Sequence, residues 1–208
     1  RGIAVPYAQL PDFHMDVLKE VGTIGAGHAA TALSQLMNKP IDMRVPQVRF
    51  LPFEEIVEIL GGAEKVVVSI YMRVVGDCPG HLFFMIDRSG AKQLLRHLAG
   101  IHVLDEEYSD MEISALCEIG NILAGSYLSS LADFTHLWMT TTVPSITEDM
   151  AGAVLSFSLM QYGAMGDRAL LIDTELFAGK RQVEGHFFLV PDPGAFEAMF
   201  KALGVPLE

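Results

Sequence analysis

The sequence has few of the residues that redox, metal or nucleic-acid chemistry requires. Its two cysteines, Cys78 and Cys117, form no CxxC pair, so neither a disulfide framework nor a cysteine metal site is expected. Lysine and arginine number 14 against 26 aspartates and glutamates, which gives a formal net charge of -12. Because affinity for nucleic acid comes largely from Lys and Arg, this balance disfavours a nucleic-acid partner.

Long apolar runs are also missing. No run of eighteen apolar residues occurs, so no membrane span is expected. The N-terminal residues show no charged segment followed by an apolar stretch, so no secretory signal is expected either. Together with the sparse use of cysteine, these absences favour a cytoplasmic location. The chain is 50% hydrophobic and 19% charged, a balance typical of a folded globule.

Familiar catalytic motifs are absent as well. The sequence contains no P-loop, no Gly-x-Ser-x-Gly and no Cys/His cluster with metal-ligand spacing. Its seven histidines are scattered, although His81 and His186 each follow a glycine in matching apolar segments. Structural repetition explains that match better than metal binding does, so we predict no metal site and no cofactor of the chain's own.

The most informative stretch runs from Ser114 to Pro144 and begins SALCEIGNILAG. Read as a helix, it carries an apolar or small-residue stripe at steps of three and four, formed by Ile113, Leu116, Cys117, Gly120, Leu123, Ala124, Tyr127, Leu128 and Leu131. The opposite face carries Ser114, Glu118, Asn121 and Gly125. Glu118 and Asn121 therefore project as neighbours about one turn apart. Such a pair offers a charged anchor beside a neutral hydrogen-bonding group.

The same pattern occurs earlier in the chain. The segment EVGTIGAG at residues 20–27 matches EIGNILAG at 118–125, with five of eight residues identical. Each copy reads Asp or Ser, three residues, Glu, two residues, Thr or Asn, twenty-two residues and Pro. The matched pairs, each 98 positions apart, are Asp16 and Ser114, Glu20 and Glu118, Thr23 and Asn121, and Pro46 and Pro144.

This doubled pattern resembles the CheC/CheX/FliY family of bacterial chemotaxis phosphatases, and the resemblance covers nearly the whole chain. It implies a phosphatase that hydrolyses the aspartyl phosphate of a CheY-type receiver domain. In that reaction Asn121 would position the attacking water and Glu118 would dock a lysine of the receiver. Mg²⁺ is expected on the phosphorylated receiver, and the resemblance also implies CheD, a receptor deamidase, as a partner.

The first copy departs from the family pattern. Glu20 is retained, but Thr23 replaces the asparagine, and a threonine hydroxyl is shorter and has no amide plane. Site one is therefore expected to bind rather than to catalyse. Asp16, Ser114, Pro46 and Pro144 are taken as residues that support the two motifs. The acidic pair Glu148 and Asp149 is a candidate contact for CheD.

The repeat predicts an α+β fold, with residues 1–208 forming a single domain of two repeats at about 12–104 and 109–208. The two halves are expected to be related by a pseudo-twofold axis, with long helices at about 12–37 and 109–132 packed with a sheet. Short helices are predicted at 54–60, at 89–100 with Ser89 as its cap, and from 193 onwards. Strands are predicted at 43–51, 65–76, 80–86, 139–146, 154–162, 168–177 and 184–191.

Three glycines, Gly22, Gly25 and Gly27, lie inside the first helix, and each destabilises a helix by about 1 kcal/mol relative to alanine. Close packing of another helix and close approach of a partner both explain them.

Three functional readings stay open from the sequence. The first is the phosphatase, and the second is a non-catalytic adaptor that binds CheD or phosphorylated CheY, or acts as a flagellar-switch-like component. The third is a structural α+β domain without a site. Glu118, Asn121 and Pro144 favour retained catalysis, whereas the loss of asparagine at position 23 favours a partial adaptor role.

Overall fold

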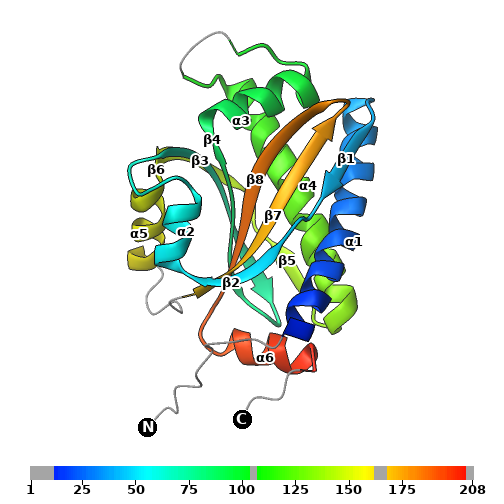
Figure 1. The fold of residues 1–208 in the computed structure, drawn as a ribbon, viewed down its shortest axis with the longest axis vertical. Coiled ribbons are helices and arrows are strands. Elements are labelled where there is room, and N and C mark those ends of the chain that lie inside the picture. The colour runs from blue at the N-terminus through cyan, green and yellow to red at the C-terminus, as the bar shows by residue number, and fades with distance from the viewer. Residues whose placement is uncertain (1–11, 104–106, 162–167, 205–208) are drawn as a thin grey trace.

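One curved antiparallel sheet organises the protein, as Figure 1 shows for the computed structural model, which describes residues 12–103, 107–161 and 168–204. The strands are β1 (Ile41–Arg44), β2 (Val48–Pro52), β3 (Val66–Gly76), β4 (Gly80–Asp87), β5 (Met139–Thr141), β6 (Ser145–Met150), β7 (Arg168–Ala178) and β8 (Arg181–Pro191). The helices are α1 (Asp12–Met37), α2 (Phe53–Ile59), α3 (Arg88–Leu94), the π-helical turn η1 (Leu95–Ala99), α4 (Asp110–Thr135), α5 (Ala151–Gln161) and α6 (Ala195–Ala202).

The two halves of the chain have the same order of elements and exchange their edge strands. The sheet runs β1-β7-β8-β4-β3-β5, with β2 also paired to β7 and β6 also paired to β3. The long β7–β8 hairpin of the second half therefore carries the edge strands of the first half, and β3–β4 carries those of the second. Because neither half completes its part of the sheet alone, both share one sheet. The α+β class and the duplicated order were predicted correctly.

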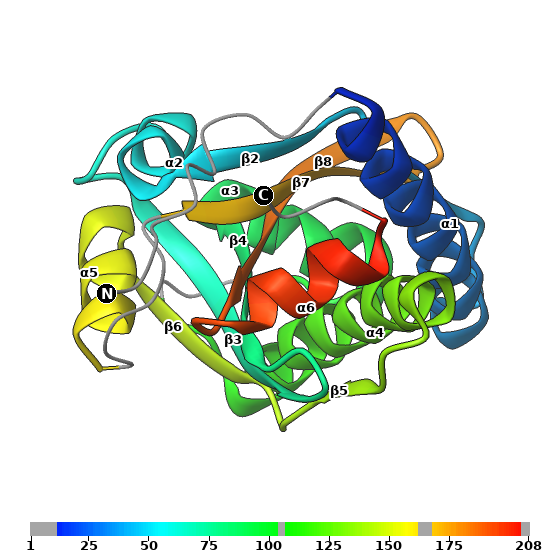
Figure 2. The same cartoon turned by 90° about the horizontal axis from the view of Figure 1, so that it is seen from below.

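The helices cover the two faces of the sheet unequally. The long helices α1 and α4 pack side by side over one face, while α2 and α5 cover part of the other (Figures 1 and 2). The larger core lies under α1 and α4, and α6 closes one end of it. Its centre holds Phe84 stacked on Phe187, with ring centroids 4.8 Å apart. Tyr127 of α4 packs edge-on against Phe187 and bonds through its hydroxyl to Thr174.

The long helices begin and end close to the predicted residues. Ser109 caps α4 in a capping box: its hydroxyl accepts from the Glu112 amide, and the Glu112 carboxylate accepts from the Ser109 amide at 2.6 Å. Glu112 is almost fully buried, so this capping bond satisfies a carboxylate that the core would otherwise leave without a partner.

The predicted strand at 154–162 is wrong, because residues 151–161 form helix α5. Val and Phe in this segment are typical of strands, but Ala151, Val154 and Leu155 lie three and four residues apart and bury one helical face in the second core. α5 follows β6 directly, as α2 follows β2 in the first half. The two halves are therefore more alike than the sequence predicted, because each has a helix directly after its second strand.

Three further predictions, two strands and one helix cap, need correction. The single strands predicted at 43–51 and 139–146 are each two strands, since the chain leaves the ladder around Pro46 and Pro144. A proline has no N–H to donate to a ladder. Asp87, and not Ser89, caps α3: its carboxylate accepts from the Gly90 amide at 2.6 Å. Residues 1–11, which precede the first predicted helix, lie outside the described residues.

Candidate functional site

The predicted pair Glu118 and Asn121 lies on the outer face of α4. Glu118 is exposed and Asn121 is partly exposed. Leu116 and Leu123 of the predicted apolar stripe have 0% exposure, and so does Ile119 beside them. No hydrogen bond joins the Asn121 carboxamide to another described residue, so both its oxygen and its nitrogen are available to an outside group.

The matching residues of α1 occupy the equivalent outer face. Asp16, Glu20 and Thr23 are all exposed. The Thr23 hydroxyl, however, donates to the Lys19 carbonyl of its own helix at 2.8 Å. This bond uses the only proton of the hydroxyl, so Thr23 can accept a hydrogen bond but not donate one at the same time. A carboxamide does both, which makes the two sites chemically different.

The helix glycines divide into two kinds. A Cβ at Gly25 would lie 2.9 Å from the Tyr127 ring, and one at Gly120 would lie 2.9 Å from Ile70. These two glycines therefore permit close internal packing, the first between α1 and α4 and the second between α4 and β3. Gly27 and Gly125 have open space where a Cβ would be. They lie on the outer faces, so internal packing does not explain them, and the approach of a partner stays a hypothesis for these two.

The helices α1 and α4 run side by side in opposite directions (Figure 1), so the equivalent exposed residues Glu20 and Glu118 lie towards opposite ends of the pair. The helices pack closely where Gly25 meets Tyr127. Counted from that crossing at about 1.5 Å per residue, Glu20 and Glu118 lie roughly 20 Å apart along the helix axes. The structure therefore does not combine the two carboxylates into one site. Each copy of the motif therefore forms a separate candidate site.

The motif prolines lie in matching loops beside their helices. Pro46 is exposed in the loop between β1 and β2, and Pro144 is partly exposed in the loop between β5 and β6. Val45 contacts α1, since a Cβ at Gly22 would lie 3.6 Å from its side chain. This contact places the first loop next to the turn of α1 that carries Thr23.

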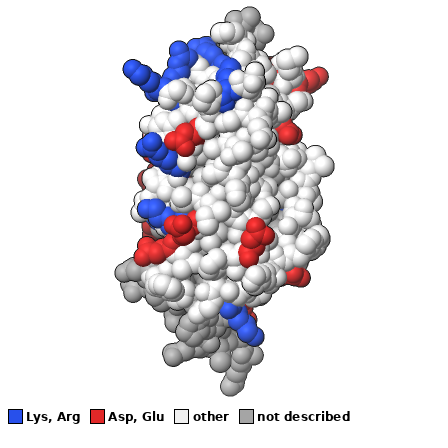
Figure 3. Space-filling view, turned by 90° about the vertical axis from the view of Figure 1, so that its right-hand side faces the viewer, with Lys and Arg blue, Asp and Glu red and all other residues white. Residues whose placement is uncertain are grey.

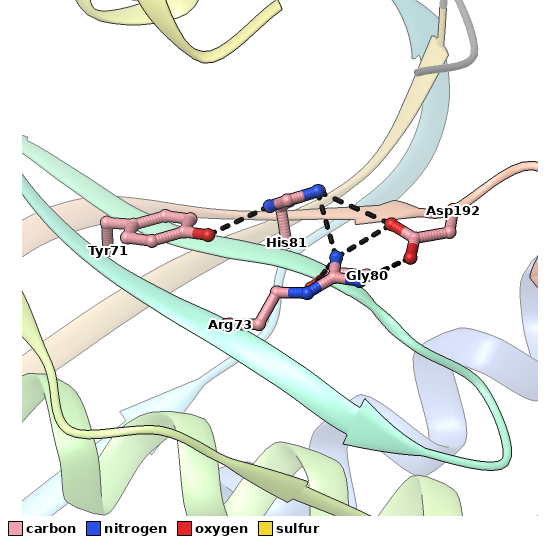
Figure 4. Close-up of polar contacts among 5 residues, drawn as sticks. All are labelled: Tyr71, Arg73, Gly80, His81 and Asp192. Carbon is pink, nitrogen blue, oxygen red and sulfur yellow. Dashed lines mark hydrogen bonds and ion pairs between the residues drawn. The ribbon is translucent and has the colours of Figure 1, made fainter. Parts of the chain in front are cut away.

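Two polar clusters were not predicted, and both lie on the sheet face opposite α1 and α4. In the first, Arg73 bonds to both carboxylate oxygens of Asp192, one at 2.7 Å, and to the Gly80 carbonyl (Figure 4). The buried ring of His81 lies between Arg73 and the Tyr71 hydroxyl, each at 2.9 Å. The second cluster joins Arg49, Asp173 and His186 by contacts of 2.8 Å.

These clusters explain the matching histidines as structural groups. The hydrogen bond from Arg73 lowers the pKa of Asp192, while burial and the Arg73 charge lower the pKa of His81. His81 is therefore neutral at pH 7. The Arg73–Asp192 pair ties β3 of the first half to the end of β8 in the second half.

We expect Asp192→Asn to lower the free energy of unfolding by about 1–2 kcal/mol at neutral pH. The native pKa of Asp192 lies below its unfolded value, so the pair stabilises the fold above that value and ceases to do so as the pH falls through the native pKa. Urea unfolding at pH 7 and at successively lower pH measures this, and the two proteins should converge once the pH has fallen through the native pKa of Asp192. Asp133→Asn, at an exposed position on α4, is the control. Equal stability of wild type and D192N at pH 7 would show that the ion pair contributes nothing.

The fold and the site define a duplicated α+β protein that presents one carboxylate motif on each of two outward-facing helices. A family model for the CheC-like family matches residues 13–49 and 111–148, which contain both motifs. CheY-P phosphatase CheC of Bacillus subtilis (strain 168) is 45% identical over 200 residues, which cover 93% of this chain and 95% of that protein. The chain belongs to the CheC-like family.

Solved structures share the fold at lower identity. FliY from Thermotoga maritima superposes with a TM-score of 0.71 at 19% identity, covering 94% of this chain and 98% of that one. The FliM middle domain from H. pylori gives 0.65 at 14% identity, covering 93% of this chain and 99% of the other. These likenesses concern the fold alone. Within the described residues, every helix is too short or too polar to span a membrane.

Proposed function

We propose that this protein hydrolyses the aspartyl phosphate of a CheY-type receiver domain, with α4 as the catalytic helix. The observation that carries the proposal is the outward-facing pair Glu118 and Asn121, in a chain 45% identical to a CheY-P phosphatase over nearly its full length. The duplication supports it further, because it repeats the spacing of an exposed carboxylate at both sites. Glu118 and Asn121 do not form part of the core, so packing does not explain why these residue types occur there.

In this reaction the chain itself supplies only the positioning of the attacking water. The side-chain amide of Asn121 does not titrate usefully, so it is no general base, but it can donate to and accept from a water molecule and so fix that water's position. The water oxygen then attacks phosphorus in line with the aspartyl oxygen, whose bond to phosphorus breaks. Inorganic phosphate leaves and the receiver regains its carboxylate.

Charge stabilisation in this proposal belongs to the substrate. The receiver's own Mg²⁺ and lysine neutralise the phosphoryl oxygens, so the phosphatase needs to supply only alignment and docking. Glu118 would pair with that lysine and set the register of the receiver on α4. Because both partners of such a pair are solvent-exposed before docking, it contributes orientation more than affinity.

Site one is proposed to bind without appreciable catalysis. Its Glu20 is exposed like Glu118, but the Thr23 hydroxyl proton is committed to the Lys19 carbonyl. A water at this position would lack the donor that Asn121 supplies at site two. This difference also keeps the adaptor function open for the first half of the molecule.

The test is the decay of a purified phosphorylated receiver domain with and without this protein. We expect the protein to accelerate the release of phosphate catalytically, at substoichiometric concentration, and chelation of Mg²⁺ to abolish the acceleration. Binding of the phosphorylated receiver without any faster decay would favour the adaptor function instead. If the receiver neither binds nor decays faster, the structural domain is the remaining interpretation.

CheD is proposed as a second partner on the basis of the family resemblance, with the exposed Asp149 of β6 as a contact. We expect Asp149→Lys to weaken the complex about tenfold or more, which isothermal titration calorimetry measures. Asp42→Lys is the matched control. Both aspartates lie on edge strands, and each accepts from the next amide, that of Met150 or Met43. Unchanged affinity in D149K would remove this segment from consideration.

A further inference from the structure

The outer face of each long helix carries a longer regular stripe than the motif itself. Steps of three and four residues continue from the motif towards the helix N-terminus and reach a large apolar side chain in both copies. The stripes are Phe13, Asp16, Glu20, Thr23 and Gly27 on α1, and Met111, Ser114, Glu118, Asn121 and Gly125 on α4. This spacing is the one with which a helix packs along a partner surface.

Phe13 and Met111 are unusually exposed for large apolar residues, each at 70%. Each lies seven residues, or two helical turns, before the glutamate of its stripe, about 10 Å along the helix. At the other end of each stripe, Gly27 and Gly125 leave open space. On one face, each long helix thus carries an exposed apolar side chain, then a carboxylate, then a glycine with open space beside it.

Exposure of a single apolar side chain is ordinary and needs no explanation. Leu36 and Phe134, for example, are also equivalent positions and are 53% and 47% exposed. They lie near the C-terminal ends of α1 and α4, and they project from the side of each helix opposite to the stripe. What distinguishes Phe13 and Met111 is their continuity with the candidate site. The side of the molecule on which α1 lies is mostly uncharged, with scattered acidic side chains and with basic side chains mainly along its upper and left edges (Figure 3).

We propose that Phe13 and Met111 are apolar docking contacts for the receiver domain, one at each site, and that they supply affinity while the glutamates supply orientation. This inference rests on the proposed function. An exposed ion pair contributes little free energy, whereas burying an apolar side chain in an interface contributes much more. The unbranched Met111 adapts to varied surfaces, and the Phe13 ring is rigid. The occupant is an apolar patch of the receiver beside its phosphorylation site.

The arrangement assigns different kinetic roles to neighbouring residues on one stripe. Met111 is a positioning residue, because it lies two turns away from Asn121 and touches no reacting atom. Its loss should weaken docking equally in the ground state and the transition state. Such a loss raises KM and leaves kcat unchanged. Phe13 should contribute to binding at site one in the same way, with no effect on kcat.

The experiment compares Met111→Ser with the matched control Phe134→Ser in steady-state hydrolysis of the phosphorylated receiver. We expect M111S to raise KM about tenfold, equivalent to about 1.4 kcal/mol, with kcat unchanged at saturating receiver. F134S should leave KM within twofold of wild type. Titration with a receiver activated by beryllofluoride and Mg²⁺ reports binding without chemistry. There, Phe13→Ser and Met111→Ser should each weaken one of two binding events.

Several outcomes would overturn the inference. An unchanged KM in M111S, or an equal rise in F134S, would remove Met111 from the docking surface. A change in sedimentation without a change in KM would show that a second copy of this chain occupies the stripe. Failure of the proposed function is distinguishable, because the wild-type protein would then not accelerate decay at all. Thermal melts of F13S and M111S should agree with wild type, since both positions are 70% exposed, and a melt of the half-exposed F134S checks that this control is folded.

Discussion

Asn121→Ala is expected to reduce the rate of receiver dephosphorylation about a hundredfold while the receiver still docks through Glu118. Asn121 lies on the outer face of α4, and its carboxamide bonds to no other described residue. An alanine there would remove the proposed donor and acceptor for the attacking water. Loss of one aligned hydrogen bond in a transition state costs about 3 kcal/mol, which corresponds to roughly this factor.

The effect should appear in kcat and not in KM, because the lost interaction is made only in the transition state. Decay of the phosphorylated receiver at saturating and limiting concentrations separates the two constants. The fold should not change, since Asn121 faces away from the core formed with Leu116, Ile119 and Leu123. A thermal melt alongside the assay checks this. A large rise in KM with kcat unchanged would make Asn121 a docking residue.

Thr23 provides the matched control in the first half. We expect Thr23→Ala to lower the rate by less than twofold, because its hydroxyl already bonds to the Lys19 carbonyl. Thr23→Asn is expected to raise activity if Glu20 and Pro46 still present a docking surface. If T23A is as damaging as N121A while both variants remain folded, the assignment of α4 as the principal catalytic helix is wrong.

Gly25→Ala is expected to destabilise the protein by about 1–3 kcal/mol, although alanine is a better helix former than glycine. The new Cβ would lie 2.9 Å from the Tyr127 ring and 3.1 Å from the Ser126 carbonyl oxygen. The ring cannot move away easily, because the Tyr127 hydroxyl bonds to Thr174 and its ring packs on Phe187. The helices α1 and α4 would have to separate locally. Chemical unfolding in urea measures the change.

Gly27→Ala, two residues further along the same helix, is expected to have the opposite sign. Open space surrounds the position of its Cβ, so alanine should stabilise the fold by about 1 kcal/mol. The comparison separates the two explanations for the helix glycines within one helix. Equal destabilisation by both substitutions would mean that Gly27 also has a packing role that the structure does not show.

Much of the architecture was predictable because it repeats. The constant offset of 98 positions between matched motif residues identified two equivalent helices. Helical periodicity then placed Glu20 and Glu118 on outer faces. Both properties are local, since they depend on residues within a few turns of one another. The capping pattern at Ser109 is local in the same way. The helices α1 and α4 therefore begin and end within a few residues of the predicted positions.

Elements whose conformation depends on distant partners were predicted poorly. Residues 154–161 have the composition of a strand, but packing of Val154 and Leu155 in the second core makes them part of α5. Tertiary packing overrides the intrinsic strand propensity of a segment when a helix buries more apolar surface than a strand would at the same place. The exchange of edge strands between the halves was likewise invisible, because strand pairing joins segments far apart in sequence.

The sequence by itself determined the two motifs, their register and the side of each helix on which they lie. Only the tertiary structure decided that Gly25 serves packing while Gly27 does not, and that two Arg–Asp–His clusters join the halves. Tertiary structure also decided that Phe13 and Met111 stay exposed on the motif stripes. The physical reason is the same in each case. Periodicity fixes the direction in which a side chain points, but what it meets there depends on which distant segment the fold brings to that face.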